Sequence, residues 1–465
     1  MAIPFRILRY NENLQEWGMN FVRNLTARNE FHNWTAVPES FWPPNPAFAG
    51  SLVWDTPPTK KSGNFNIIPY VTAGVERQAS SDKTDFTWGV GADARVSVTS
   101  TLNLDLTVNP DFSQIEVDEL VTNLTRFNIF LPEKRTFFLE NSDLFADFGF
   151  GQARPFFSRK IGLDANRAAV PILYGARLTG NVNPNLRIGA MNIHSGEGDD
   201  SFGQNQSAVS FQQKFGRSFV QGIFLNRQAF DKADIVQQDY GRNASMEGVY
   251  VSDDGKILTA VGVHQSFKPN VSERTGFYNT VFQYRNPSWE VLTDFVFMQE
   301  NYFADMGFLG RIENYDAARD TVVRLGFNQN YTSVEYIVRP KDKEGKIAQH
   351  RFGAENLTVL NTDWSFNERN TRLRYFMNFR NKSEIRVRLN NTGLDLLFPF
   401  SFTGGDPLPA QQYNFTDLNI EYQSDERKAF SYSVSGQVGG FYNGTLNRIE
   451  ANACLLYTSP SPRDS

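Results

Sequence analysis

The sequence predicts an all-β fold, a large antiparallel transmembrane β-barrel of about 16–20 strands that is incomplete and carries a lumenal or loop insert. Three observations carry this prediction: long runs of alternating apolar and polar residues, an aromatic-rich composition, and the absence of a long apolar run. The clearest alternating run spans Phe86–Val108. Strands of soluble sheets usually stop near five or six residues, whereas about 9–11 tilted residues are needed to cross a bilayer as β-structure.

This run has one apolar and one polar face. After a short break the alternation resumes over Leu102–Val108, so the run is interpreted as a hairpin of two long strands. We expect the apolar face to contact lipid and the polar face to contact the lumen. The predicted lipid-facing residues are Phe86, Trp88, Val90, Ala92, Ala94, Val96, Val98, Leu102, Leu104, Leu106 and Val108.

The composition fits a membrane barrel and excludes a helical membrane protein. Of the 465 residues, 40% are hydrophobic and 14% aromatic, yet the mean hydropathy is -0.43, as expected when apolar and polar residues are interleaved. No window approaches the roughly 20 apolar residues of a transmembrane helix. A large soluble β-sandwich or propeller is the alternative, because such folds are also aromatic-rich. The length of the runs favours the barrel.

Charge and histidine spacing limit the expected partners. A net charge of -5 without a Lys/Arg-dense stretch argues against nucleic acid. The four histidines are scattered, so we expect no metal site and no cofactor. The expected partner is outer-membrane lipid. The histidines are His32, His194, His264 and His350.

Both ends of the sequence have unusual features. Residues 454–465, which include the single cysteine, Cys454, resemble a translated sequencing adapter and are interpreted as an artefact tail. The first residues show no basic region followed by an apolar region, so no signal peptide is recognised. Because an outer-membrane barrel must be exported, we expect the sequence to be a fragment.

The sequence pattern divides the chain into several regions. Residues 1–60 are predicted to be the remnant of a preceding β-sandwich domain and its linker, and residues 61–453 to be the outer-membrane barrel. Residues 108–163 form an insert that breaks the alternation. Several stretches are predicted to be surface loops or lumen-filling segments, at about 110–168, 229–240, 301–318 and 393–410.

A late hairpin carries a row of arginines that alternates with apolar residues. Arginine facing lipid at the bilayer midplane costs roughly 2–4 kcal/mol, so these side chains should point into the lumen. Two alternatives remain open: attraction of anionic solutes, or pairing with acidic residues of neighbouring strands or a plug. This lumenal basic stripe comprises Arg372, Arg374, Arg380, Arg386 and Arg388.

Four stretches of the insert carry a family resemblance. They closely resemble the signature of an uncharacterised bacterial outer-membrane family, the domain of unknown function 5916, and comprise Val108–Asp118, Asn123–Phe127, Leu131–Asn141 and Pro155–Gly162. The resemblance implies a Gram-negative exported protein with a carbohydrate-binding family-nine-like sandwich before a large barrel. It also implies saccharide binding through that preceding domain, nearly all of which this sequence lacks.

The insert is predicted to fold into or across the lumen as a plug. We expect Glu133, Lys134, Arg135 and Glu140 to pair with wall residues such as Arg95. The full set of lumen or plug candidates is Asp111, Glu116, Asp118, Arg126, Glu133, Lys134, Arg135, Glu140 and Arg159.

The carboxylates of the insert also raise the question of catalysis. They are numerous enough for a glycosidase pair or a calcium site, but no spacing fixes either arrangement. No residue is therefore predicted to be catalytic, and the chain is not expected to be an enzyme. The predicted function is an outer-membrane channel or uptake barrel for carbohydrate-related solutes. The alternatives are a surface hydrolase acting on glycosidic substrates and a structural or secretion-associated plugged barrel.

Overall fold

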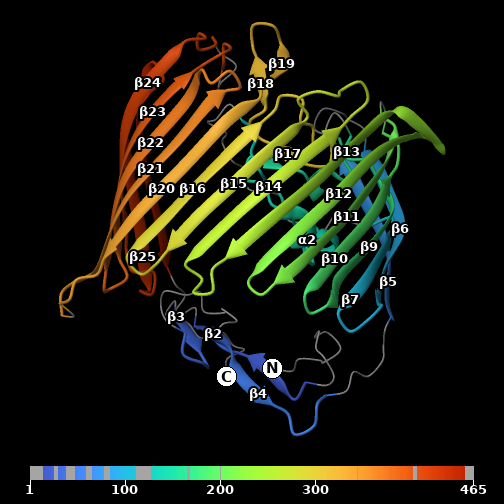
Figure 1. Ribbon diagram of the computed structural model, residues 1–465, viewed down its shortest axis with the longest axis horizontal. Coiled ribbons are helices and arrows are strands. Elements are labelled where there is room, and N and C mark those ends of the chain that lie inside the picture. The colour runs from blue at the N-terminus through green and yellow to red at the C-terminus, as the bar shows by residue number, and fades with distance from the viewer. Residues whose placement is uncertain are drawn as a thin grey trace.

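Eighteen long strands dominate the structure, a computed structural model (Figure 1). It describes residues 14–25, 30–37, 48–58, 65–77, 84–110, 127–164, 168–198, 201–342, 344–401 and 406–455. The barrel strands are β5 (Phe65–Arg77), β6 (Thr84–Ser97), β7 (Leu102–Val108), β9 (Ile172–Asn183), β10 (Leu186–Ser195), β11 (Gly203–Phe215), β12 (Ser218–Asp231), β13 (Asp234–Val251), β14 (Ile257–Phe267), β15 (Gly276–Arg285), β16 (Trp289–Met298), β20 (Phe327–Val338), β21 (Ile347–Asn361), β22 (Phe366–Phe379), β23 (Glu384–Asp395), β24 (Gln412–Gln423), β25 (Phe430–Phe441) and β26 (Gly444–Leu455).

These strands follow one another around a ring in chain order. β9 follows β7 directly, β20 follows β16, and β26 lies next to β5. The number of strands lies within the predicted range, and the all-β barrel fold is confirmed. Cys454 and Leu455 are the last residues of β26.

Side-chain alternation gives the barrel an apolar outer face and a polar inner face. On β6 the predicted lipid-facing residues Phe86 and Trp88 are 70% and 73% exposed, since no part of the protein covers them. On the opposite face of β7, Asp105 and Thr107 are buried. This is the pattern of a strand with lipid on one side and a filled lumen on the other. Among the described residues, no helix is long and apolar enough to cross a membrane.

The two ends of the barrel differ in their connections. At one end the hairpins close with tight turns, such as residues 184–185 between β9 and β10 and 216–217 between β11 and β12. The longest connections, residues 109–171, 299–326 and 396–411, all leave the other end. In outer-membrane barrels short turns are periplasmic and long loops extracellular, which makes the long-loop end the outer mouth.

One predicted loop is a strand hairpin instead. Residues 229–240 were expected to form a loop, but β12 continues to Asp231 and β13 begins at Asp234, with Phe230 opposite Ile235. The alternation fades here because a strand that extends beyond the bilayer needs no lipid-facing residue. Lys232 makes the tight turn with a φ of 53°.

Four short strands precede the barrel and lie at the end with the short turns (Figure 1). β1 (Glu16–Met19) pairs with β4 (Gly50–Val53), and β2 (Val22–Leu25) pairs with β3 (Glu30–Asn33). They form two separate two-stranded sheets. The indole rings of Trp17 and Trp54 meet edge to face with centroids 5.2 Å apart.

Two chain segments leave the wall at the mouth; the first enters the ring, and part of the second projects beyond the strand ends (Figure 1). We call residues 127–164 the lumenal insert; it holds α1 (Thr136–Leu139), α2 (Asp143–Ala146), β8 (Ala153–Arg154) and the 3-10 turn η4 (Ser158–Lys160). We call residues 299–326 the second lumenal segment; it holds β17 (Phe308–Leu309), β18 (Glu313–Asp316) and β19 (Thr321–Arg324).

Candidate functional site in the barrel lumen

The lumenal insert packs an apolar face onto one side of the barrel wall. Phe145 of α2 and Ile161 are buried in a cluster with Met191, Ile223 and Leu225, which point inward from β10 and β12. Burying each such side chain stabilises the packed state by roughly 1.5–3 kcal/mol. Further buried members of the cluster are Phe138, Leu144, Phe148, Phe156, Ile172, Ile193, Ala208 and Met306. Apolar side chains therefore fill the lumen along this side.

A network of charges ties the insert to β6, β7 and β9. Arg177 Nη2 lies 2.9 Å from Asp105 Oδ2, and Arg177 Nη1 donates to the backbone carbonyl of Glu140 over 2.8 Å. Arg95 Nε lies 2.6 Å from Asp105 Oδ1, and Arg95 also binds the Glu140 carboxylate. Arg177 is 1% exposed. A guanidinium this deep requires such partners, because an unpaired buried charge is strongly unfavourable.

Two neighbouring candidates, Glu133 and Arg135, bind each other within the insert. Arg135 Nη2 lies 2.7 Å from Glu133 Oε2, and Arg135 Nη1 donates to the carbonyl of Ile161 over 2.8 Å. The sequence led us to expect pairing with the wall, whereas these two side chains, two residues apart in the chain, pair with each other. Burial would raise the pKa of Glu133, but the hydrogen bond and charge of Arg135 hold it below its ordinary value.

The remaining insert candidates are placed as follows. The backbone N–H of Lys134 donates to Glu133 Oε1 over 2.9 Å, and Arg159 Nη1 donates to the carbonyl of Pro132 over 2.9 Å. Four candidates lie outside the described residues: Asp111, Glu116, Asp118 and Arg126.

A wall carboxylate anchors the backbone of the insert. Glu247 of β13 accepts the N–H of Gly149 over 2.7 Å and the side-chain amide of Gln221 over 2.8 Å. Gln221 in turn donates to the carbonyl of Asp147 over 2.7 Å. Gly149 has a φ of +81°, and a Cβ atom there would lie 2.1 Å from the carbonyl oxygen of Ala153. The turn therefore requires glycine.

The second lumenal segment joins the insert. β17 pairs antiparallel with β8, matching Phe308 with Arg154 and Leu309 with Ala153. The N–H of Phe157 also donates to the carbonyl of Met306 over 2.7 Å. The two lumenal segments therefore pack as one body.

On the other side of the barrel the predicted basic stripe is ion-paired. Arg372 and Arg374 of β22 both bind Glu355 of β21. Arg386 and Arg388 of β23 each lie 3.0 Å from Glu421 of β24. This is the paired arrangement, one of the two alternatives left open by the sequence.

Arg380 differs from the other four arginines of the stripe. It follows β22, in a turn at the end with short connections, and donates to the backbone carbonyls of Asp342 and Gly345. It therefore lies off the strand wall.

A cavity of about 1280 Å³ lies between the lumenal segments and the wall at the mouth. Its lining combines aromatic rings with amide and charged side chains. The lining includes Phe157, Arg159, Lys160, Asp164, Glu197, Ser201, Phe202, Gln204, Gln206, Arg227, Asp231, Asp239, Phe303, Asp305, Phe308, Glu313 and Arg324. Most of these residues were not predicted, because the segments that carry them are far apart in the sequence.

One carboxylate of this cavity is held by two wall cations. Asp305, in the second lumenal segment, lies 2.9 Å from Arg227 Nε and 2.9 Å from Lys268 Nζ. Burial would raise the pKa of Asp305, but the charges of Lys268 and Arg227 hold it below its ordinary value. The carboxylate therefore stays ionised to a lower pH than an ordinary aspartate.

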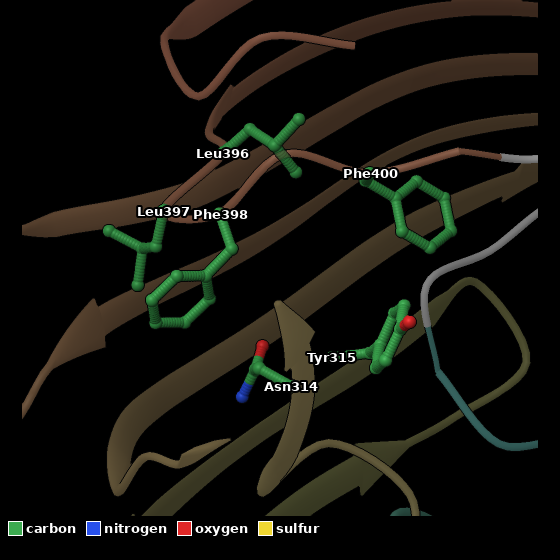
Figure 2. A pocket seen from close by; sticks show the side chains of 6 residues that line it. All are labelled: Asn314, Tyr315, Leu396, Leu397, Phe398 and Phe400. Atoms are coloured by element: carbon green, nitrogen blue, oxygen red, sulfur yellow. The ribbon is translucent and has the colours of Figure 1, made fainter. Parts of the chain in front are cut away.

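A smaller recess of about 20 Å³ lies at the mouth, where the β18–β19 hairpin meets the connection after β23 (Figure 2). The N–H of Ala317 donates to the carbonyl of Pro399 over 3.4 Å, and the Arg319 guanidinium lies 5.8 Å from the centre of the Phe398 ring. The recess has room for about one water molecule, so it is a packing contact between two loops.

The ring of tilted strands, the apolar outer face and the filled lumen define an outer-membrane β-barrel with a lumenal body at its mouth. The sequence profile of the domain of unknown function DUF5916 matches residues 62–182, which span the first barrel strands and the insert. No curated protein sequence matches the chain.

Two solved structures are similar to parts of this barrel. One is a BenF-like porin from Pseudomonas fluorescens Pf-5, at 10% identity and a TM-score of 0.34, with 84% of this chain and 97% of that chain covered. Another is OccK9 (OpdG) of Pseudomonas aeruginosa, at 10% identity and a TM-score of 0.31, with 83% of this chain and 94% of that chain covered.

Proposed function

We propose that this chain is an outer-membrane uptake barrel that admits carbohydrate-like solutes into the cavity at its mouth. The observation that carries the proposal is the cavity itself, about 1280 Å³ between the lumenal segments and the wall. Ligand pockets usually measure about 300–1,000 Å³, so this cavity has room for a solute of several rings. A barrel with only a structural role would have no need for such a space behind its mouth.

The chemistry of the lining favours polyhydroxylated solutes. Phe157, Phe202 and Phe308 offer apolar faces of the kind that pack against the C–H side of a sugar ring. Gln204 and Asp231 offer amide and carboxylate groups that form hydrogen bonds with hydroxyl groups. This mixture suits a solute that is apolar on its ring faces and polar around its edge.

The lumenal body acts as the gate in this proposal. It packs on β9–β12, β15, β16, β20 and β21 through buried apolar residues, whereas Arg372 of β22 and Arg386 of β23 remain 41% and 30% exposed. We infer that solutes leave the cavity along β22 and β23 when the body shifts. The ion pairs and hydrogen bonds between the lumenal body and the wall would then determine how often the gate opens.

Solute flux through purified barrels in liposomes tests the proposal. Ser201 lines the cavity, so Ser201→Trp should reduce the flux of mono- and disaccharides several-fold by filling it. Asp253→Trp, in an exposed turn at the other end, is the matched control and should leave the flux unchanged.

Each outcome of these experiments distinguishes between the alternative functions. Equal flux through both variants would overturn the role of the cavity. No saccharide flux through the unsubstituted barrel would support the structural alternative. Hydrolysis of a glycoside by the unsubstituted barrel that Glu140→Gln abolishes would support the hydrolase alternative.

A further inference from the structure

The cations of the cavity converge on one carboxylate. Asp305 Oδ1 lies 2.9 Å from Lys268 Nζ, and Asp305 Oδ2 lies 2.9 Å from Arg227 Nε. Lys160 of η4 lines the same cavity, and its ammonium donates to the carbonyl of Ala304, the residue before Asp305. The three cations come from β12, the connection after β14 and the lumenal insert.

The charge around this carboxylate remains positive. Arg227 also binds Asp239, with Nη2 2.5 Å from Oδ1. Arg324, which binds Glu313, also acts on Asp305 electrostatically, so four cations face three carboxylates. If Asp305 withdrew, the local charge would rise from +1 to +2. The side chains of Arg227 and Asp305 are 14% and 15% exposed, so these charges act in a largely desolvated place, where they attract an anion more strongly than in water.

The wall beside Asp305 leaves room for a carboxylate and little else. A Cβ atom on Gly241 of β13 would lie 2.2 Å from Asp305 Oδ2. The carboxylate therefore rests against bare backbone. Any side chain at residue 241 would occupy the position of the oxygen atom.

We propose that Arg227, Lys268 and the backbone at Gly241 form a subsite for the carboxylate of an entering solute, which Asp305 occupies in the resting barrel. This inference rests on the proposed function and narrows its solutes to sugar acids or similar small carboxylates. An entering carboxylate takes the place of Asp305 on the two cations. The exchange detaches the second lumenal segment from β12 and from the connection after β14.

The adjacent contacts favour a local exchange. Asn243 donates to the carbonyl of Phe303 over 2.6 Å, and the N–H of Phe303 donates to Ser266 Oγ over 3.1 Å. These hydrogen bonds hold the backbone of Phe303, two residues before Asp305, against the wall. The Asp305 side chain can therefore leave the cations while the backbone of Phe303 stays bound to the wall.

Binding of acetate to full-length variants tests the subsite. Asp305→Ala empties the subsite, and acetate should bind this variant at least about tenfold more tightly than it binds the unsubstituted barrel. In the unsubstituted barrel, hydrogen exchange of residues 299–326 should accelerate when acetate is added at constant ionic strength set with chloride, because acetate displaces Asp305; in Asp305→Ala the exchange should be fast with and without acetate. Asp239→Ala is the matched control: it removes the other carboxylate from Arg227 but leaves Asp305 in place, so acetate should bind this variant less tightly than it binds Asp305→Ala.

Should Asp305→Ala fail to fold, Asp305→Asn provides the same test, since it keeps the side-chain volume and removes the negative charge. Acetate binding that is no tighter in these variants than in the unsubstituted barrel would overturn the subsite. Neither readout needs transport. Acetate binding without saccharide flux would overturn only the proposed function, and flux without acetate binding would overturn only the subsite.

Discussion

The two sides of the barrel lumen accommodate their inward-facing side chains in different ways. On the covered wall, β9–β12, inward-facing side chains are buried under the lumenal body, and Arg177 is 1% exposed. On the charged wall, β22–β24, arginines pair with glutamates of the same or the neighbouring strand, and Arg372 is 41% exposed. Because the contacts on the covered wall are buried, breaking one costs much free energy, whereas solvent screens the ion pairs on the charged wall. The covered wall should therefore fix the body, and the charged wall should tolerate change.

The largest difference is expected for arginine replacements. Arg177→Met removes a buried cation that binds both Asp105 and the backbone of Glu140. Docking of the insert should weaken by about 3 kcal/mol, near the lower end for a broken buried pair, because Arg95 still binds Asp105. Faster protease cleavage within residues 127–164 would measure this loss. Unchanged cleavage would mean that apolar packing alone fixes the body.

Glycine replacements give the next largest difference. Gly149→Ala places a Cβ atom 2.1 Å from the carbonyl oxygen of Ala153 at a φ of +81°, which should cost about 1–3 kcal/mol. Gly436→Ala in β25 is the control, because a Cβ atom there meets nothing within 4 Å. Hydrogen exchange near residue 149 should accelerate only in the first variant. Similar effects of both substitutions would show that the turn at residue 149 does not require glycine.

The counterpart of Arg177→Met on the charged wall is Arg372→Met. Arg372 binds Glu355 over 3.3 Å and is 41% exposed, and Glu355 keeps Arg374 as a partner. The barrel should lose less than about 1 kcal/mol, as is usual for exposed pairs. The midpoint of heat-induced unfolding, followed by the gel mobility of the barrel, measures this. A loss as large as that of Arg177→Met would show that the charged wall is also dry.

The smallest expected effect is a response to acid. The pKa values of Glu133 and Asp305 lie below their ordinary values in the folded barrel. The stability that their ion pairs contribute is therefore fully present at pH values above the ordinary pKa values. This stability should be lost as the pH falls from about 4 through the lowered values. Protease cleavage of the insert should rise over this range. The pKa of Asp147 is raised by burial and acts in the opposite direction, so Asp147→Asn should keep the acid response.

The sequence allowed the barrel to be predicted because lipid imposes a local rule on every strand. Trp88 and Asp105 differ in surroundings, and their positions in an alternating run already indicated this. The alternation failed beyond the bilayer, where Phe230 and Ile235 pair without any lipid to select them.

The cavity was harder to predict than the wall. Arg227, Lys268 and Asp305 lie on three segments, and no local pattern indicates that their charges meet. Glu133 and Arg135 were recognised as candidates, but their pairing with each other was not, because the sequence does not show which way two side chains two residues apart will point.

The pairing of β8 with β17 bears on the order in which the protein assembles. These strands bring Ala153 next to Leu309, and β9–β16 lie between them in the chain. Contacts between such distant residues form slowly, since a long loop must close before they are gained. The lumenal body can be completed only after half of the ring has formed around it. A stable β8–β17 pair would therefore mark a late step in folding.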